Sequence, residues 1–283
     1  MELFRTTPPR TVCPNFYVLS HANGCMFQPV CTYCYLKSSF WYLNRPHVFT
    51  NKDKLLQEVR AWIEKDDLEC FVLNSGNLSD SLAFEPERPL VADLVELFRE
   101  AENNGRPHSL LLVTKAGVQH CKFLLDLPPC RNVIISFSVN CEEAASRLEV
   151  GAASPEDRLK AARELKQLGW RVRIRLDPMI AGYDYTPIAL EIRRLKPELV
   201  TLGSLRAERN LRRFLPGSLR SGLKQTTERG GLDRYPEADR VALYRQAASL
   251  IGPEIPIGLC EETREVWEAV LGALDEPRCN CSP

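Results

Sequence analysis

Three cysteines that lie close together are the residues best suited to chemistry. Cys25, Cys31 and Cys34 are spaced C-x5-C-x2-C, in a Gly- and Pro-containing stretch without regular periodicity. Thiols this close together on a loop are typical ligands of a metal centre. A zinc ion needs a fourth ligand, for which His21 is the nearest candidate, whereas an iron–sulfur cube on three thiolates keeps one iron open. Aromatic and aliphatic neighbours favour the cluster, because a partly dry shell tunes its potential; the remaining alternative is three unconnected thiols.

The loop resembles the cluster loop of radical S-adenosylmethionine enzymes, specifically that of the spore photoproduct lyase family. Gly24–Cys25 and Cys31–Leu36 carry the likeness, although the family usually has three residues between its first two cysteines and this chain has five. Further stretches match in order over roughly residues 10 to 190. The resemblance implies a [4Fe-4S] cluster on the three cysteines, S-adenosylmethionine at the open iron, and an electron donor such as flavodoxin or ferredoxin. It also implies reductive cleavage of the cofactor to a 5′-deoxyadenosyl radical, which abstracts a substrate hydrogen.

The same resemblance implies which residues hold the cofactor. The segment Asn74–Asp80 matches the place where radical enzymes grip the methionine end of the cofactor. The lysine of Val113–Lys115 matches one that contacts the cofactor carboxylate, and two serines match further contacts. The candidate cofactor-binding residues are Tyr35, Asn74, Ser75, Ser79, Lys115, Ser138 and Arg158.

Without the resemblance these residues have plainer interpretations. The loop around Gly76 permits a close backbone approach, but it is equally a capped turn before a helix. A lysine just past a strand is usually solvated, and Glu149 with Arg158 can simply brace a loop.

Tyr35, Asp177 and Cys141 are the candidate catalytic residues. Asp177 ends a predicted strand, where its carboxylate either faces the mouth of the fold or caps the next turn. In spore photoproduct lyase the segment matching Asn74–Asp80 carries a cysteine that returns a hydrogen atom to the repaired base, and the residue aligned with it here is Asn77. Cys141 could take that role, but a single cysteine beside a strand end is more often buried filler.

Hydrophobic periodicity predicts the elements that position these residues. Strands are expected at 16–19, 70–74, 110–114, 133–139, 171–176, 199–202 and 255–259, and helices at 51–65, 89–101, 118–125, 155–168, 188–195, 238–251 and 261–274. This alternation predicts an α/β fold with a parallel sheet and right-handed crossovers. The resemblance implies a partial (β/α)6-type barrel, with the chemistry at the carboxyl ends of the strands. We expect a barrel core at 1–203, a basic insertion at 204–235, and a last barrel unit with a cysteine-bearing extension at 236–283.

Composition sets broad limits. The 283 residues contain 37 Lys plus Arg and 37 Asp plus Glu, so net charge argues neither for nor against nucleic acid. No run of 18 apolar residues and no signal-peptide core is present, so we expect a cytoplasmic protein without a membrane segment. Eleven cysteines, an odd number, in such a protein indicate metal binding and free thiols rather than disulfides.

The C-terminal third departs from the resemblance. Between Arg206 and Arg234 eight basic residues face three acidic ones among several glycines, which indicates either a loop that meets phosphates or a solvated surface loop. Cys260 follows the last predicted strand, and Cys279 and Cys281 lie at the end of the sequence. If the tail folds back, these three thiols could hold a second, auxiliary iron–sulfur cluster; a tail zinc site and a disordered tail are the alternatives.

Three classes of function follow. Asn77 and the tail cysteines favour a radical enzyme, lyase-like or transferase-like, that acts on a peptide or small metabolite. The basic segment favours a radical enzyme that acts on a nucleic-acid base, including a DNA photoproduct repair lyase. The third class is a non-enzymatic zinc-binding structural protein.

Overall fold

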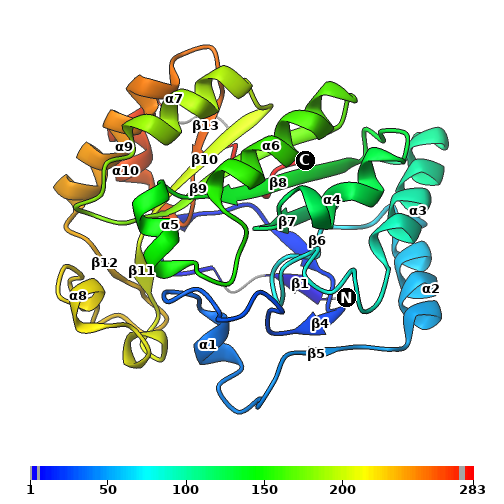
Figure 1. The fold of residues 1–283 in the computed structure, drawn as a ribbon, viewed down its shortest axis with the longest axis horizontal. Coiled ribbons are helices and arrows are strands. Elements are labelled where there is room, and N and C mark those ends of the chain that lie inside the picture. Colours follow the sequence, from blue (N-terminus) through cyan, green and yellow to red (C-terminus); the bar gives the residue numbers. More distant parts are fainter. Residues whose placement is uncertain (1, 5–6, 274–277) are drawn as a thin grey trace.

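An open, curved sheet of eight strands forms the centre of the computed structural model, which describes residues 2–4, 7–273 and 278–283 (Figure 1). All neighbouring strands are parallel except the first pair. The strand order confirms the predicted α/β partial barrel and adds an antiparallel edge strand. In spatial order the strands are β1 (Glu2–Phe4), β3 (Phe16–Val18), β6 (Val72–Asn74), β7 (Ser109–Thr114), β8 (Val133–Val139), β9 (Arg171–Met179), β10 (Leu199–Ser204) and β13 (Ile257–Leu259).

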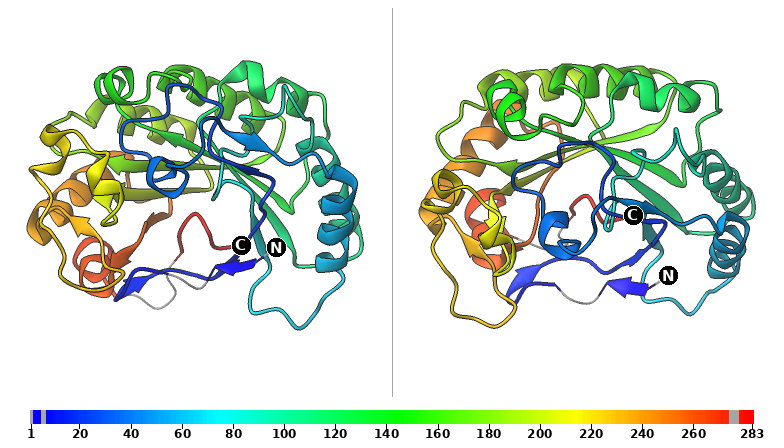
Figure 2. Two further views of the ribbon diagram at one scale, coloured as in Figure 1. Left: turned by 90° about the horizontal axis from the view of Figure 1, so that it is seen from below. Right: turned by 60° about the horizontal axis from the view of Figure 1, so that its bottom comes forward.

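Helices cover the convex outer face of the sheet (Figures 1 and 2). Strand side chains alternate between the two faces, so Val133, Ile135 and Phe137 of β8 pack into the large apolar core beneath these helices. Ile134, Ser136 and Ser138 alternate with them and face the inner side of the sheet. The covering helices are α2 (Lys52–Ile63), α3 (Val91–Asn103), α4 (Val118–Leu125), α6 (Pro155–Gln167), α7 (Thr186–Leu195) and α9 (Glu237–Ile251). None of the helices in the described residues is long and apolar enough to cross a membrane.

The predicted elements are present, with boundary shifts and additions. The sequence missed several short elements: the pairs β4 (Ala22–Asn23) with β5 (His47–Val48) and β2 (Thr11–Val12) with β14 (Glu262–Thr263), and the helices α1 (Leu36–Ser39) and α5 (Glu142–Leu148). The last helix, α10 (Arg264–Leu271), begins three residues later than predicted, because Thr263 caps it and β14 occupies the preceding residues. Its predicted end at Leu274 lies outside the described residues.

The basic segment is more ordered than the loop that was expected. It contains β11 (Arg206–Ala207) paired with β12 (Asp233–Arg234), a 3-10 turn η1 (Leu211–Arg213) and α8 (Gly217–Arg220). Leucines spaced along the segment form an apolar cluster, which the count of charged residues did not indicate. That cluster includes Leu211, Leu215 and Leu219 and extends to Cys31 and Tyr33. The segment therefore packs against the cysteine loop.

The end of the chain returns into the concave side of the sheet, drawn in red in Figure 2. Gly258 makes room for it, because a Cβ there would lie 2.0 Å from the carbonyl oxygen of Arg278. Arg173, on the inner face of β9, donates to the carbonyl oxygens of Asn280 (3.1 Å) and Pro283 (3.1 Å). The tail therefore folds back, which is one of the alternatives that the sequence left open.

Candidate functional site

The cysteine loop lies between β4 and α1, on the side where the parallel strands end. Cys31 is buried, and Cys25 and Cys34 are half-buried. Two backbone hydrogen bonds fix the loop, from Gly24 to the Leu78 carbonyl oxygen (3.0 Å) and from Thr32 to that of Leu148 (2.7 Å). Burial raises the pKa of the Cys34 thiol to about 12, so a metal has to displace its proton on binding.

His21 is engaged in other contacts. Its Nε2 lies 3.1 Å from the Ser75 carbonyl oxygen and therefore donates, while its Nδ1 accepts from Arg88 at 3.1 Å. Burial and the Arg88 charge lower its pKa to about 4, which keeps the ring neutral. With both nitrogens occupied, His21 has no lone pair left for a metal, and the expectation of His21 as a fourth zinc ligand is wrong for this arrangement.

No three His, Cys, Asp or Glu side chains within the described part of the chain are placed to hold a single metal ion.

Asp80, which the sequence analysis did not select, fixes the loop after β6. Its carboxylate accepts from Thr114 Oγ1 (2.8 Å) and from the backbone N–H of Lys115 (2.7 Å). Gly76 lies against β7, since a Cβ there would be 2.6 Å from that of Val113. A side chain at position 76 would therefore clash with β7. The sequence feature that could have identified Asp80 is its place at the end of a polar loop, where an aspartate typically accepts hydrogen bonds from backbone N–H groups.

Ser75 and Ser79 in this loop are buried, as is Asn74. The Ser75 hydroxyl lies 2.8 Å from that of Ser81, and Asn74 Oδ1 accepts from the Gly76 N–H at 2.8 Å. These contacts shape the loop, so its side chains and amides are held at the strand ends beside the cysteines.

Lys115 and Ser138 meet at the ends of β7 and β8, where Lys115 Nζ donates to Ser138 Oγ at 2.8 Å and to Glu149 at 3.2 Å. Glu149 also pairs with Arg158 at 2.6 Å, with both side chains fully buried, and accepts from Tyr33 OH. Burial by itself raises the pKa of Glu149, but the charges of Lys115 and Arg158 outweigh this effect and lower the pKa to about 2. This buried charge network reaches the cysteine loop through Tyr33, which lies between Cys31 and Cys34.

Asp177 lies at the end of β9 between two guanidinium groups. It accepts from Arg206 at 2.7 Å and from Arg175. Although burial raises it, Arg206 and Arg175 hold its pKa well below the usual range. Gly203 leaves the space, since a Cβ there would be 2.4 Å from Asp177 Oδ1. Asp177 therefore faces the interior as an ion-paired carboxylate rather than capping the next turn.

Cys141 and Tyr35 are placed very differently. Cys141 is 4% exposed and packs in the large apolar core, which is the filler interpretation of this residue. Tyr35 follows the third loop cysteine, and its hydroxyl donates to the backbone carbonyl oxygen of Asn77. The cysteine loop and the β6 loop are thus tied together at Asn77.

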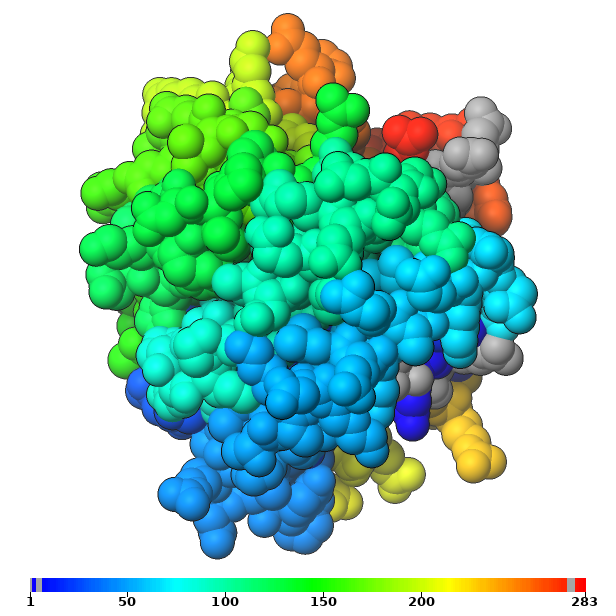
Figure 3. Space-filling model, turned by 90° about the vertical axis from the view of Figure 1, so that its right-hand side faces the viewer, coloured from blue at the N-terminus to red at the C-terminus, as the bar shows by residue number. Residues whose placement is uncertain are grey.

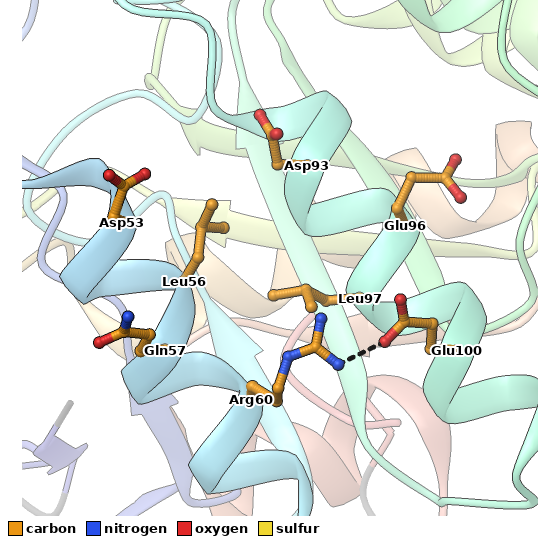
Figure 4. Close-up of a pocket in the computed structure, with 8 residues that line it drawn as sticks. All are labelled: Asp53, Leu56, Gln57, Arg60, Asp93, Glu96, Leu97 and Glu100. Carbon is orange, nitrogen blue, oxygen red and sulfur yellow. Dashed lines mark hydrogen bonds and ion pairs between the residues drawn. The ribbon is translucent and has the colours of Figure 1, made fainter.

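A surface groove lies elsewhere. About 480 Å³ in volume, it runs between α2 and α3 on the outer face, which Figure 3 shows from outside and Figure 4 in close-up. Its carboxylates include Asp53, Asp93 and Glu96, and the Arg60–Glu100 ion pair at 2.6 Å crosses it. The groove is lined by no thiol and lies between two helices, away from the ends of the strands. We therefore do not place the function there.

The sequence model of the spore photoproduct lyase family matches residues 9–195, about two thirds of the chain. The chain belongs to the spore photoproduct lyase family. A curated spore photoproduct lyase from Geobacillus sp. is 27% identical over 163 residues, which cover 58% of this chain and 46% of that protein. The chain thus spans about half the length of the curated relative it matches.

Solved structures agree on the fold. Spore photoproduct lyase complexed with dinucleoside spore photoproduct has a TM-score of 0.71 at 20% identity, covering 91% of this chain and 79% of that one. A double mutant of it with bound S-adenosylmethionine and dinucleoside spore photoproduct has a TM-score of 0.70 at 19% identity, with 92% and 79% covered. Streptococcus suis SuiB bound to S-adenosylmethionine has a TM-score of 0.54 at 14% identity, with 91% and 53% covered.

The family match confirms the resemblance from which a [4Fe-4S] cluster and S-adenosylmethionine were expected. The residues present fit both groups. Three thiols lie on one fixed loop for the cluster, and a lysine, serines and a carboxylate converge beside it for a cofactor that carries a carboxylate and an ammonium group. The individual ligand assignments stay predictions.

Proposed function

We propose that this protein is a radical S-adenosylmethionine enzyme that acts on a base of a nucleic acid. The observation that carries the chemistry is the position of the cysteine loop directly over the ends of β6, β7 and β8. Tyr33 of this loop donates to Glu149, and Lys115 Nζ lies 3.2 Å from Glu149 and 5.8 Å from the centroid of the Tyr33 ring. A metal centre and a charged cofactor would therefore share one partly buried space.

In this proposal Cys25, Cys31 and Cys34 hold the cluster, and the cluster and cofactor together supply a carbon radical when reduced by a donor such as flavodoxin or ferredoxin. Lys115 and Ser138 bind the cofactor carboxylate, while Ser79 and the amides of the β6 loop orient its methionine end. The buried Glu149–Arg158 pair holds Lys115 in place. Tyr35 closes the loop over Asn77 and limits access of water to the reacting atoms.

The substrate class is argued from the surface beside this loop. Trp41 and Tyr42 are 73% and 59% exposed and follow α1 directly, and Phe214 of the insertion is 42% exposed. Ser38 of α1 donates to Glu208, which joins α1 to the insertion. The segment after α1 and the insertion both project from the same end of the molecule (Figure 3). Exposed aromatic rings of this kind are stacking platforms for unpaired bases.

Charge supports the same partner. Of the eight basic residues between 206 and 234, three are held in ion pairs, namely Arg206, Arg212 and Arg234. The other five are exposed, and within the described residues none has an ion-pair partner: Arg209, Arg213, Arg220, Lys224 and Arg229. Cations without a counter-charge next to exposed rings suit a phosphate backbone with splayed bases.

The dinucleoside bound in the similar lyase structure supports a nucleic-acid base as the substrate. The sequence favoured a peptide or small metabolite instead, and no comparison supports that substrate class. A DNA photoproduct is the narrower form of this proposal. Asn77 stands where that family carries its hydrogen-donating cysteine, so repair here would need a donor from another position.

Two measurements test the proposal. Anaerobically reconstituted, reduced protein is expected to cleave S-adenosylmethionine, and absence of cleavage in iron-replete protein would refute the radical assignment. Binding of a single-stranded oligonucleotide tests the substrate class. The double variant Trp41→Ala/Tyr42→Ala should weaken it by about 1–3 kcal/mol per lost stack, while Leu168→Ala, an exposed apolar residue elsewhere, should not. Equal affinity in all three proteins would exclude this surface.

A further inference from the structure

We propose that Cys13, Cys260, Cys279 and Cys281 are the four ligands of a second iron–sulfur cluster, in which Cys13 completes a set that the sequence reveals only in part. The inference rests on the proposed function, since the second cluster would serve the same enzyme. It adds a ligand and a consequence: with four thiolates, no iron stays open for a substrate.

The pairing of β2 with β14 places Cys13. In that antiparallel pair Val12 is opposite Glu262 and Thr11 is opposite Thr263. Continuing the register puts Cys13 opposite Glu261, next to Cys260. Both cysteines thus lie just beyond the same two-stranded pair, although 246 residues separate them in sequence.

The return of the tail places the other two thiols. A Cβ on Gly258 would lie 2.9 Å from the Cα of Cys279, so the tail crosses β13 two residues before Cys260. Ser136, on the inner face of β8, donates to Asn280, which is 1% exposed. Cys279 is buried, and Cys281 packs against the inner apolar cluster of β3, β6, β7 and β8.

Register and backbone contacts bring the four cysteines into one region. Cys13 and Cys260 lie beside each other at the end of the β2–β14 pair, and the tail that carries Cys279 and Cys281 crosses β13 two residues before Cys260. None of the described cysteines forms a disulfide. The four cysteines outside the two groups, Cys70, Cys121, Cys130 and Cys141, come from separate elements and have no such neighbours. Four reduced cysteines from three segments that are distant in sequence therefore lie in one region of the fold.

The surroundings of the set suit thiolate ligands. Cys260 Sγ accepts from Arg175 at 3.3 Å and from Arg206 at 3.2 Å. Arg173 and Arg175 lie near Cys279. The carboxylates facing these arginines are Asp177, Glu198 and Glu261. Guanidinium groups stabilise the negative charge of a thiolate-bound cluster, and hydrogen bonds to the ligand sulfurs raise its reduction potential.

A chain of hydrogen bonds joins the second set to the first site. Arg175 contacts both Cys260 and Asp177, the Asp177 carbonyl oxygen accepts from Ser138 Oγ at 3.2 Å, and Ser138 Oγ accepts from Lys115 at 2.8 Å. The second set therefore lies beside the residues proposed to hold the cofactor. A fully ligated cluster there transfers electrons to or from the radical site, or fixes the tail, but does not bind the substrate.

The test removes the loop ligands first. Protein with Cys25→Ala/Cys31→Ala/Cys34→Ala, reconstituted anaerobically with iron and sulfide, should hold about four irons per chain and give the electron paramagnetic resonance signal of one reduced [4Fe-4S] cluster. Adding Cys13→Ala should remove that iron, as should adding Cys260→Ala. Adding Cys70→Ala, a half-buried cysteine outside both groups, should leave it in place.

Each outcome is decisive. Iron retained after Cys13→Ala would overturn Cys13 as a ligand, and no iron in the loop variant, or zinc in its place, would overturn the second cluster. The proposed function is judged separately, from cofactor cleavage by the wild-type protein. Four irons in the loop variant would uphold this inference even if the wild type cleaved no S-adenosylmethionine.

Discussion

The two thiol groups differ in how the chain assembles them. Cys25, Cys31 and Cys34 lie within ten residues on one loop, fixed by backbone hydrogen bonds to neighbouring loops. Cys13, Cys260, Cys279 and Cys281 come from three segments that meet only after the sheet has formed. The first group can be recognised by its spacing. Three cysteines of the second group were candidates from the sequence, but Cys13 is added only by the register of β2 with β14. A local ligand set is complete in a sequence, whereas a long-range set is visible there only in part.

The largest expected effect separates the loop group from ordinary cysteines. Cys31→Ala should abolish cleavage of S-adenosylmethionine by reduced, reconstituted protein and remove about four irons, because the loop cluster loses one of its three ligands. Cys70→Ala is the matched control and should retain both properties. Cleavage that persists in the Cys31→Ala protein would show that the loop is not the radical site.

The next effect concerns the buried charges beneath the loop. Glu149→Gln leaves Arg158 and Lys115 without their counter-charge, so the free energy of unfolding in urea should fall by about 3–5 kcal/mol. Glu100→Gln, in the exposed pair with Arg60, should cost less than about 1 kcal/mol. Similar losses in both variants would mean that Glu149 is not the support of the site.

This effect has a defined pH dependence. The pKa of Glu149 is about 2 in the folded protein, against 4.5 for a free glutamate. The stabilisation is therefore complete above pH 4.5 and is lost as the pH falls from 4.5 towards 2. The difference between wild type and Glu149→Gln should be constant near neutral pH and shrink below pH 4.5.

A smaller effect tests cofactor binding beside the loop. Lys115→Ala should weaken binding of S-adenosylmethionine by about 1–3 kcal/mol, since a charged hydrogen-bond partner of the carboxylate is lost. Iron content should not change. Calorimetry on the reconstituted protein measures the affinity, with the exposed Lys122→Ala as control. Unchanged affinity would return Lys115 to a purely structural role with Glu149.

The smallest effect is on the tail. Ser136→Ala removes the hydrogen bond to Asn280 and should lower stability by about 1 kcal/mol, with faster hydrogen exchange in residues 278–283. Ser146→Ala, whose hydroxyl bonds an exposed carbonyl, is the control. Exchange that stays unchanged in the Ser136→Ala protein would show that Arg173 alone holds the tail.

The sequence by itself determined much of the architecture, the loop cysteines and three of the four cysteines of the second group. Strands such as Val133–Val139 and helices such as Pro155–Gln167 were predictable because their apolar periodicity is local. In β9 arginines alternate with apolar residues, a local pattern that places Arg173 and Arg175 on the same face. The cysteine loop was predictable for the same reason, since all its ligands lie in one short stretch.

Tertiary structure alone decided the rest, because it depends on contacts between residues far apart in the chain. Asp80 fixes its loop because β7 lies beside it and supplies the backbone N–H of Lys115. His21 is excluded as a metal ligand because its two ring nitrogens contact Ser75 and Arg88. The leucines of the insertion pack into an apolar cluster, which the high content of charged residues in that segment did not predict. Cys13 joined the tail thiols only when β2 paired with β14, since register across a sheet is set by packing and not by local sequence.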